Sequence, residues 1–208
     1  DLVTCESWSN IPLNESFATY GEYLWNENKY GREEADYEGL NDLNEYLAEA
    51  KYKQVDLIRF TYKSREDVYD RHSYAKGGRI LHMLRKYVGD DAFFASLKKY
   101  LNDNKFKTVE AHQLRLAFED VTGEDLNWFF NEWFFAKGHP DIEISYAWND
   151  TIKKQVVTIK QRQSFKETPL YKLPLKIDIY EGGKVRRESV TVETDNEIFF
   201  FDCDKKPD

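Results

Sequence analysis

Residues 13–20, LNESFATY, are the most informative stretch of the chain. They show a clear helical pattern of apolar residues, and their single acidic residue, Glu15, lies outside the apolar stripe. The apolar side chains recur every three or four residues and form one stripe of an amphipathic helix: Leu13, Phe17, Tyr20 and Leu24. Glu15 falls on the opposite face, close to Glu22. Periodicity alone therefore describes Glu15 as a solvated surface glutamate.

Helical spacing continues beyond this stretch as far as about residue 137. The next helix is expected to carry the stripe Leu40, Leu43 and Leu47, and later helices are expected around residues 73–88, 90–101, 108–121 and 126–133. Asp90 and Thr108 are the expected N-caps of two of these helices, and Gly123 is expected to end the second. Together these segments predict a helical region.

The periodicity changes at Gly138-His139-Pro140, and apolar and polar residues alternate after it. Such alternation begins with 142–148 and returns in later segments, and it is typical of strands with one buried face. Gly182-Gly183 lies between two alternating segments and predicts a hairpin turn. About five antiparallel strands are expected. The sequence thus predicts an α+β fold, with a helical region over 1–138 and a small antiparallel β-sandwich over 139–208.

The composition argues against several classes of protein. With 41% hydrophobic and 16% aromatic residues, the chain of 208 residues has enough apolar material for an ordered core. A net charge of −8 without a basic cluster argues against a nucleic-acid partner. No apolar run approaches the length of a membrane span. The two cysteines, Cys5 and Cys203, show neither a disulfide framework nor the spacing of a thiolate metal site.

A second pattern surrounds Glu15, namely Leu2-Val3-Thr4 followed by Glu6, Trp8, Leu13-Asn14-Glu15 and Phe17-Ala18. This pattern resembles the segment that joins the HExxH motif to the third metal ligand in the aminopeptidase N family of zinc metallopeptidases. In that family HExxH supplies two histidine ligands, and a glutamate of the following helix supplies the third. The resemblance implies that Glu15 is a zinc ligand. It also implies a fragment that begins just after HExxH, because too few residues precede Glu15 to hold that motif.

Two residues depart from the family's pattern. Pro12 stands where the family usually has an aromatic residue, and Ser16 stands where it usually has glycine. Neither replaced side chain is a metal ligand, so these departures concern local packing more than zinc binding.

A third pattern, SYAKGG at residues 73–78, is similar to the start of the helix that carries the family's catalytic tyrosine, and the resemblance places that role on Tyr74. A phenol has a pKa near 10 and stays protonated at neutral pH. It can therefore donate a hydrogen bond to the oxyanion that forms when water attacks a peptide carbonyl. The alternative is a buried core tyrosine, because Tyr74 shares its helical stripe with Leu81 and Leu84.

The four histidines, His72, His82, His112 and His139, do not supply the missing metal ligands. No two of them are four residues apart, as the histidines of HExxH are. Each is expected to be a surface or capping residue. This chain alone is therefore predicted to bind no catalytic zinc and to be inactive.

The resemblance implies that the intact protein is a zinc aminopeptidase that releases N-terminal residues from peptide substrates. Residues 1–138 are then the C-terminal helical part of a thermolysin-like catalytic domain, and 139–208 a sandwich truncated at its C-terminal end. The absent HExxH helix would leave an apolar core face uncovered, which predicts self-association. Two alternatives stay open: a non-catalytic module that binds a peptide or protein, and an inactive family member that acts as a scaffold. The cellular compartment is not indicated.

Overall fold

The computed structural model describes residues 2–208 and divides the chain into two compact units, Asp1–Gly138 and His139–Asp208. The division falls where the sequence changes from helical to alternating periodicity. The first unit is built from helices and the second from antiparallel strands, so the predicted α+β class is confirmed. Each unit is described by itself below.

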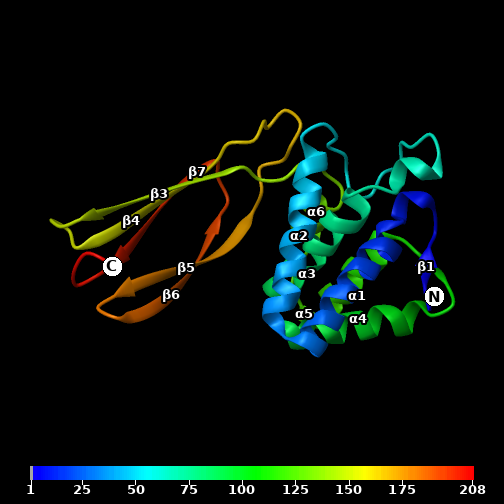
Figure 1. The fold of residues 1–208 in the computed structure, drawn as a ribbon, viewed down its shortest axis with the longest axis horizontal. Coiled ribbons are helices and arrows are strands. Elements are labelled where there is room, and N and C mark those ends of the chain that lie inside the picture. The colour runs from blue at the N-terminus through cyan, green and yellow to red at the C-terminus, as the bar shows by residue number, and fades with distance from the viewer. Residues whose placement is uncertain (1) are drawn as a thin grey trace. The chain divides into compact units, whose positions relative to one another are not determined.

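Helices form almost the whole of the first unit (Figure 1). Its α-helices are α1 (Pro12–Tyr30), α2 (Arg32–Ala50), α3 (Gly77–Val88), α4 (Asp90–Asn104), α5 (Ala111–Thr122) and α6 (Asn127–Trp133). Shorter elements are the 3-10 helices η1 (Trp8–Asn10) and η2 (Arg65–Val68), the π-helix η3 (His72–Lys76), and the parallel strand pair β1 (Thr4–Cys5) and β2 (Thr108–Val109). Helix α1 packs against α2 and α3, while α4 packs against α5.

The core of this unit forms where the apolar stripes of the helices meet. Leu84, Phe93, Leu114, Phe118 and Phe130 are completely buried. They come from α3, α4, α5 and α6, so these four helices share one hydrophobic core. This core supports α1, the helix that carries Glu15, through its contact with α3.

The buried face of α2 differs from the predicted stripe. Leu40 is 51% exposed, and the buried residues of α2 are Ala35, Gly39, Tyr46 and Ala50. The prediction was wrong for Leu40, because α2 packs there through small residues. It was right for Leu43 and Leu47, which are partly buried against the cluster of Tyr46, Ala50 and Ala75. Gly39 lies against Arg79, whose guanidinium occupies the space that a side chain at position 39 would need.

Both predicted N-caps were also wrong. Gly89, with a φ of 85°, precedes α4, and Asp90 instead uses its carboxylate to pair with Arg85. Helix α5 begins after Glu110, which forms a reciprocal capping box with Gln113, so Thr108 lies upstream in β2. The predicted end of α5 is confirmed, since Gly123 adopts the left-handed conformation with a φ of 73°.

The second unit contains a three-stranded sheet in the order β3-β4-β7 and a two-stranded sheet of β5 and β6 (Figure 1). The strands are β3 (Ile142–Asn149), β4 (Lys154–Gln161), β5 (Leu173–Glu181), β6 (Lys184–Val192) and β7 (Asn196–Asp202). All pairings within these sheets are antiparallel. Gly182 and Gly183 join β5 to β6 with φ angles of 59° and 78°, which is the two-residue hairpin predicted from the sequence.

Among residues 2–208, no helix is both long and apolar enough to cross a bilayer.

Candidate active site

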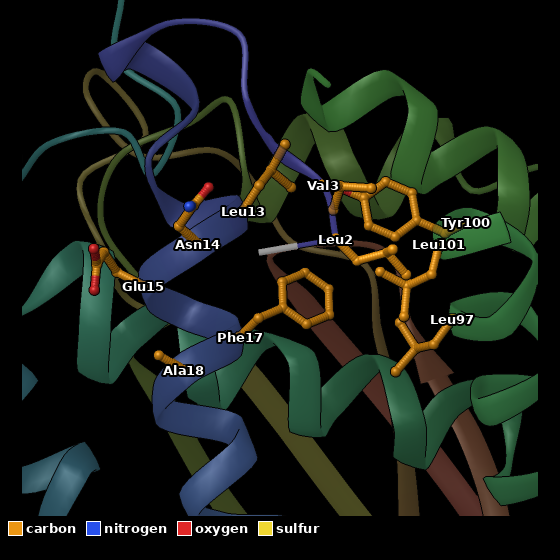
Figure 2. A pocket seen from close by; sticks show the side chains of 10 residues that line it. All are labelled: Leu2, Val3, Leu13, Asn14, Glu15, Phe17, Ala18, Leu97, Tyr100 and Leu101. Atoms are coloured by element: carbon orange, nitrogen blue, oxygen red, sulfur yellow. The ribbon is translucent and has the colours of Figure 1, made fainter. Parts of the chain in front are cut away.

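Glu15 lies in the first turn of α1, which has Pro12 at its first position. Proline is suited to this position because its missing N–H would have had no partner in the helix. An acidic side chain in the first turn is stabilised by the positive end of the helix dipole. The Glu15 side chain is half-buried, and in Figure 2 its carboxylate points away from the apolar side chains of Leu13 and Phe17.

Two clefts meet at Glu15. The first, of about 470 Å³, is the apolar groove, and Figure 2 shows its lining side chains: Leu2, Val3, Leu13, Asn14, Glu15, Phe17, Ala18, Leu97, Tyr100 and Leu101. The second, of about 530 Å³, is called the aromatic cleft, because Trp8, Tyr62 and Tyr69 are among its lining residues; Glu6 and Glu15 also line it. Glu15 is thus positioned between an apolar surface and a cleft with aromatic walls and acidic groups.

Tyr74 lies in the π-helix η3, immediately before α3. Its backbone N–H donates to the Asp70 carbonyl at 3.2 Å, and the N–H of Lys76 reaches back five residues to the Arg71 carbonyl at 2.9 Å. Such wide turns are rare, and they occur frequently at functional sites. The Tyr74 side chain is half-buried and its ring lies 6.4 Å from the ring of Tyr69, a residue of the aromatic cleft.

Glu15 and Tyr74 are far apart in the sequence, but in the fold the charge of the Glu15 carboxylate acts on the Tyr74 hydroxyl. Burial, followed by a hydrogen bond and charge repulsion from the Glu15 carboxylate, raises the pKa of the Tyr74 hydroxyl to about 12. The phenol is therefore protonated at neutral pH and can only act as a hydrogen-bond donor toward a carboxylate or an oxyanion. A tyrosine that points into the core would not contact a residue on the exposed side of α1.

The two segments that carry these residues are joined by their immediate neighbours. The Ser16 hydroxyl donates a 2.7 Å hydrogen bond to the backbone carbonyl of Ser73. A side chain at Gly77 would place its Cβ 1.8 Å from the Ser16 Oγ, so glycine is required for this close approach. Gly78 has more space: a Cβ there would be 3.1 Å from the Thr19 methyl group, a tight contact. The departure from the family's pattern at Ser16 is thus accommodated by a new hydrogen bond.

Two histidines are not at the surface, contrary to the expectation from the sequence. His72 is completely buried, and its Nδ1 lies 2.7 Å from the Glu49 carboxylate. His82 is 8% exposed, and its ring meets the stacked rings of Tyr20 and Tyr23 edge-on. Burial, reinforced by nearby cationic side chains, lowers the pKa of His82 to about 4. The expectation failed because both histidines find polar or aromatic partners inside the helical unit.

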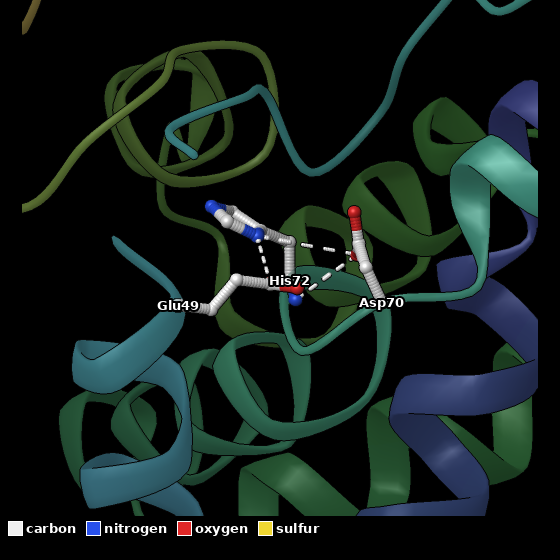
Figure 3. Close-up of side chains that lie close together, drawn as sticks. All are labelled: Glu49, Asp70 and His72. Carbon is white, nitrogen blue, oxygen red and sulfur yellow. Dashed lines mark hydrogen bonds and ion pairs between the residues drawn. The ribbon is translucent and has the colours of Figure 1, made fainter. Parts of the chain in front are cut away.

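Glu49, Asp70 and His72 form a cluster of potential metal ligands within the part of the chain that the structure describes (Figure 3). The charges around it argue against a cation. The Asp70 carboxylate already pairs with both Arg59 and Lys53, and its side chain is 5% exposed. A divalent ion here would have to displace two bound cationic groups. The cluster is therefore interpreted as a buried ion-pair network.

Several residues of this region were not found from the sequence. Arg59 and Asp70 lie in loops without periodicity, and an eleven-residue separation gives no helical or strand signal. Lys76 is 3% exposed, and burial lowers the pKa of its ammonium group to about 8. The sequence around them shows only irregularly spaced Arg, Asp and Lys residues before a glycine pair. Such a composition does not predict a buried ion-pair network.

The helical unit as a whole matches a known protein family. A model of the peptidase family M1 domain matches residues 1–133, which is more than half of the chain. The chain therefore belongs to peptidase family M1, a family of metallopeptidases. This confirms the resemblance to the aminopeptidase N family that the sequence motifs indicated.

Curated relatives are similar over most of this chain. It is 27% identical to probable aminopeptidase 1 of Sulfurisphaera tokodaii, with 95% of this chain and 26% of the relative covered. It is 29% identical to aminopeptidase N of Lactococcus lactis, with 79% and 19% covered. A crystal structure of Legionella pneumophila aminopeptidase A in complex with aspartic acid matches with a TM-score of 0.78 at 21% identity, covering 100% of this chain and 23% of that one. The chain spans about a quarter of the length of these relatives or less, and the structural likeness supports the fold.

Proposed function

We propose that this chain is part of a zinc aminopeptidase that releases single residues from the N-termini of peptides. One observation carries the proposal: in a chain that belongs to peptidase family M1, Glu15 lines the aromatic cleft together with Tyr69, and the Tyr74 ring lies 6.4 Å from the Tyr69 ring. The names of the relatives support the same activity, since aminopeptidases are among them. Peptides are accordingly the proposed substrates.

The residues around Glu15 fit one part of a zinc site. A half-buried carboxylate between two clefts is a suitable ligand, but a catalytic zinc needs three protein ligands. Among described residues 2–138, the histidines His72, His82 and His112 have other surroundings and none of them joins Glu15. We propose that two histidines of an HExxH motif outside this chain complete the ligand set.

Tyr74 supplies the hydrogen bond in this proposal. The chemistry that zinc supplies when bound is Lewis acidity, which favours attack of water on the peptide carbonyl. The Tyr74 hydroxyl, held next to Glu15, is positioned to donate to the oxygen that becomes negatively charged during that attack. Its raised pKa keeps the donated proton in place at the pH at which peptidases work.

The apolar groove has a role in the same proposal. Leu2 and Leu101 line the groove, and they are 43% and 36% exposed. We propose that the helix carrying HExxH covers this groove in the parent protein, and that a second copy of the chain covers it when the helix is absent. Sedimentation of the isolated chain tests this: Leu101→Asp should convert a dimer to a monomer, and a monomeric unmodified chain would contradict it.

The proposed function is tested in the parent protein with amino-acid anilides as substrates. Tyr74→Phe should keep zinc content and KM and lose about 10²–10³ in kcat, the cost of one oxyanion donor. Glu15→Ala should lose zinc. Tyr87→Phe is the matched control, because the Tyr87 hydroxyl also bonds a glutamate, Glu124, at 2.7 Å, but on the surface. That variant should be fully active.

Two outcomes would contradict the proposal. Unchanged turnover in Tyr74→Phe removes Tyr74 from the mechanism, and full zinc occupancy in Glu15→Ala removes Glu15 from the ligand set. A parent sequence without HExxH upstream of residue 1 would favour the inactive scaffold.

A further inference from the structure

Asp70 lies four residues before Tyr74, and its carboxylate fixes the turn between them. Asp70 Oδ1 accepts the backbone N–H groups of His72 and Ser73, each at 3.0 Å. Arg59 donates to both carboxylate oxygens, and Lys53 donates to one of them. Burial alone raises the pKa of Asp70, but the bonds from Arg59 and Lys53 lower it to about 2. Asp70 is therefore a buried, charged group whose carboxylate binds both the backbone of one turn and the side chains of Arg59 and Lys53.

Arg59 connects this turn to the body of the helical unit. The Arg59 Nη2 donates to the Ser73 hydroxyl at 2.7 Å as well as to Asp70. The backbone N–H of Arg59 donates to the carbonyl of Ser9 in η1, the element just before the helix that carries Glu15. The neighbouring Ile58 N–H donates to the carbonyl of Phe134 at 2.8 Å. The loop at Arg59 is thus held to the same frame that positions Glu15.

The turn that Asp70 stabilises is the wide turn of the π-helix. An α-helical turn is ordinarily preferred to a π-turn, so the wide turn persists only where other interactions hold it. Relaxation to an α-helical turn would rotate the residues before α3 about the helix axis. Tyr74 would then leave its position between Tyr69 and Glu15.

We propose that Asp70 is a positioning residue for Tyr74: through its ion pair with Arg59 and its two backbone bonds, it holds the π-turn that places the Tyr74 hydroxyl against Glu15. The placement of Tyr74 by Asp70 follows from contacts within the chain. Its value for catalysis rests on the proposed function, so the two are tested separately. Figure 3 shows Asp70 beside His72 at the start of this turn.

The test uses the chain of residues 1–208 with labelled tyrosine, and it compares two carboxylates in buried ion pairs. Asp70→Asn removes the charge and opposes Arg59 with an amide donor. Glu27→Gln is the matched control, because Glu27 pairs with the buried Arg85 at 2.7 Å elsewhere in the unit. Arg59→Lys is the milder variant. It keeps the positive charge but loses the guanidinium group, whose several N–H donors bind Asp70 and Ser73 at the same time.

Two local readouts are measured beside the melting temperature: the nuclear Overhauser contact between the Tyr69 and Tyr74 rings, and hydrogen exchange at the Ser73 amide. We expect Asp70→Asn and Arg59→Lys to lose the ring contact and to speed Ser73 exchange by about tenfold or more. Glu27→Gln should lower the melting temperature by a similar amount but should keep the ring contact and the slow Ser73 exchange.

The inference is overturned if a folded Asp70→Asn chain keeps the ring contact and slow Ser73 exchange. It is also overturned if Glu27→Gln loses the ring contact and slow exchange as much as Asp70→Asn does. If Asp70→Asn does not fold, Arg59→Lys decides by the same criteria. Failure of the proposed function would instead appear as unchanged turnover in Tyr74→Phe with these local readouts intact.

Discussion

The Ser16 hydroxyl and the backbone carbonyl of Ser73 form a buried hydrogen bond of 2.7 Å, and each residue is the immediate neighbour of one proposed site residue. The same serine leaves no space for a side chain at Gly77, whose Cβ would lie 1.8 Å from the Ser16 Oγ and 2.6 Å from its Cβ. Residues 16 and 77 are therefore coupled, and substitutions at the two positions should not have additive effects.

Gly77→Ala is expected to destabilise the helical unit by about 1–3 kcal/mol, because α1 must move away from the start of α3. Ser16→Gly combined with Gly77→Ala should recover most of this loss, since both atoms that clash with the new methyl group are gone. Ser16→Ala should not rescue, because its Cβ stays within the clash distance. Urea unfolding of the unmodified chain, Ser16→Gly, Gly77→Ala and the double variant gives the double-mutant cycle. Additive free energies would show that the close approach of α1 and α3 does not exist.

The second prediction concerns acid and the buried ring of His82. The pKa of His82 is lowered to about 4 in the folded chain, from an ordinary value near 6.5. The unfolded chain thus binds the proton first, so this contribution to stability is present above pH 6.5 and is lost as the pH falls toward 4. We expect His82 to account for about 2 kcal/mol of that loss, after a discount for solvent screening of the partly accessible ring.

His82→Gln should flatten the fall in unfolding free energy between pH 6.5 and 4, measured by urea titration at each pH. His112→Gln is the control, because the His112 side chain is exposed. Equal slopes in the His82→Gln variant and the unmodified chain would contradict the assignment.

Alkaline pH provides a third prediction, through Lys76. Burial, opposed in part by the charge of Asp56, lowers the pKa of the Lys76 ammonium group from 10.5 to about 8. The unfolded chain keeps the proton up to pH 10.5, so the free energy of unfolding should rise with pH from about 8 upward, by about 2 kcal/mol between pH 8 and 9.5. Lys76→Met should remove this rise. Lys51→Met, at an exposed position, should leave it unchanged. Parallel curves for Lys76→Met and the unmodified chain would exclude a buried cation at this position.

The sequence predicted the fold class because two periodicities meet at a single point, Gly138. It also brought Glu15 and Tyr74 into one hypothesis, through motifs, and in the structure the charge of Glu15 acts on the pKa of Tyr74. Periodicity alone would have placed Glu15 in solvent and Tyr74 in the core. The family motif therefore contributed what local pattern could not.

Other features could not be predicted, for physical reasons. The Arg59–Asp70 pair joins two loops, and ion pairs between loops leave no periodic trace in the sequence. Leu40 was expected to be buried because leucine is apolar, yet α2 approaches its neighbours through Ala35 and Gly39, and close helix approach selects small residues. The cap of α5 depends on Glu110 and Gln113 acting together, so a search for a single Thr or Asp cap missed it.

The last prediction concerns zinc in the isolated chain. Glu15 alone offers a single carboxylate, and the one other cluster of candidate ligands in residues 2–208, at Asp70, is occupied by two cationic side chains. Because a catalytic zinc needs three protein ligands, residues 1–208 should bind no stoichiometric zinc with a Kd below about 1 µM and should release no product from amino-acid anilides. Addition of a helical peptide that carries HExxH and an apolar face should restore zinc binding in the unmodified chain.

Glu15→Gln should abolish this restored binding, and a peptide with alanine in place of both histidines should restore none. Isothermal titration of zinc, with and without the peptide, measures each case. Tight zinc with peptidase turnover from residues 1–208 alone would show that the chain holds a complete site. If zinc binding needs the peptide but is unchanged by Glu15→Gln, the third ligand is another residue. Glu15 would then have only a structural role.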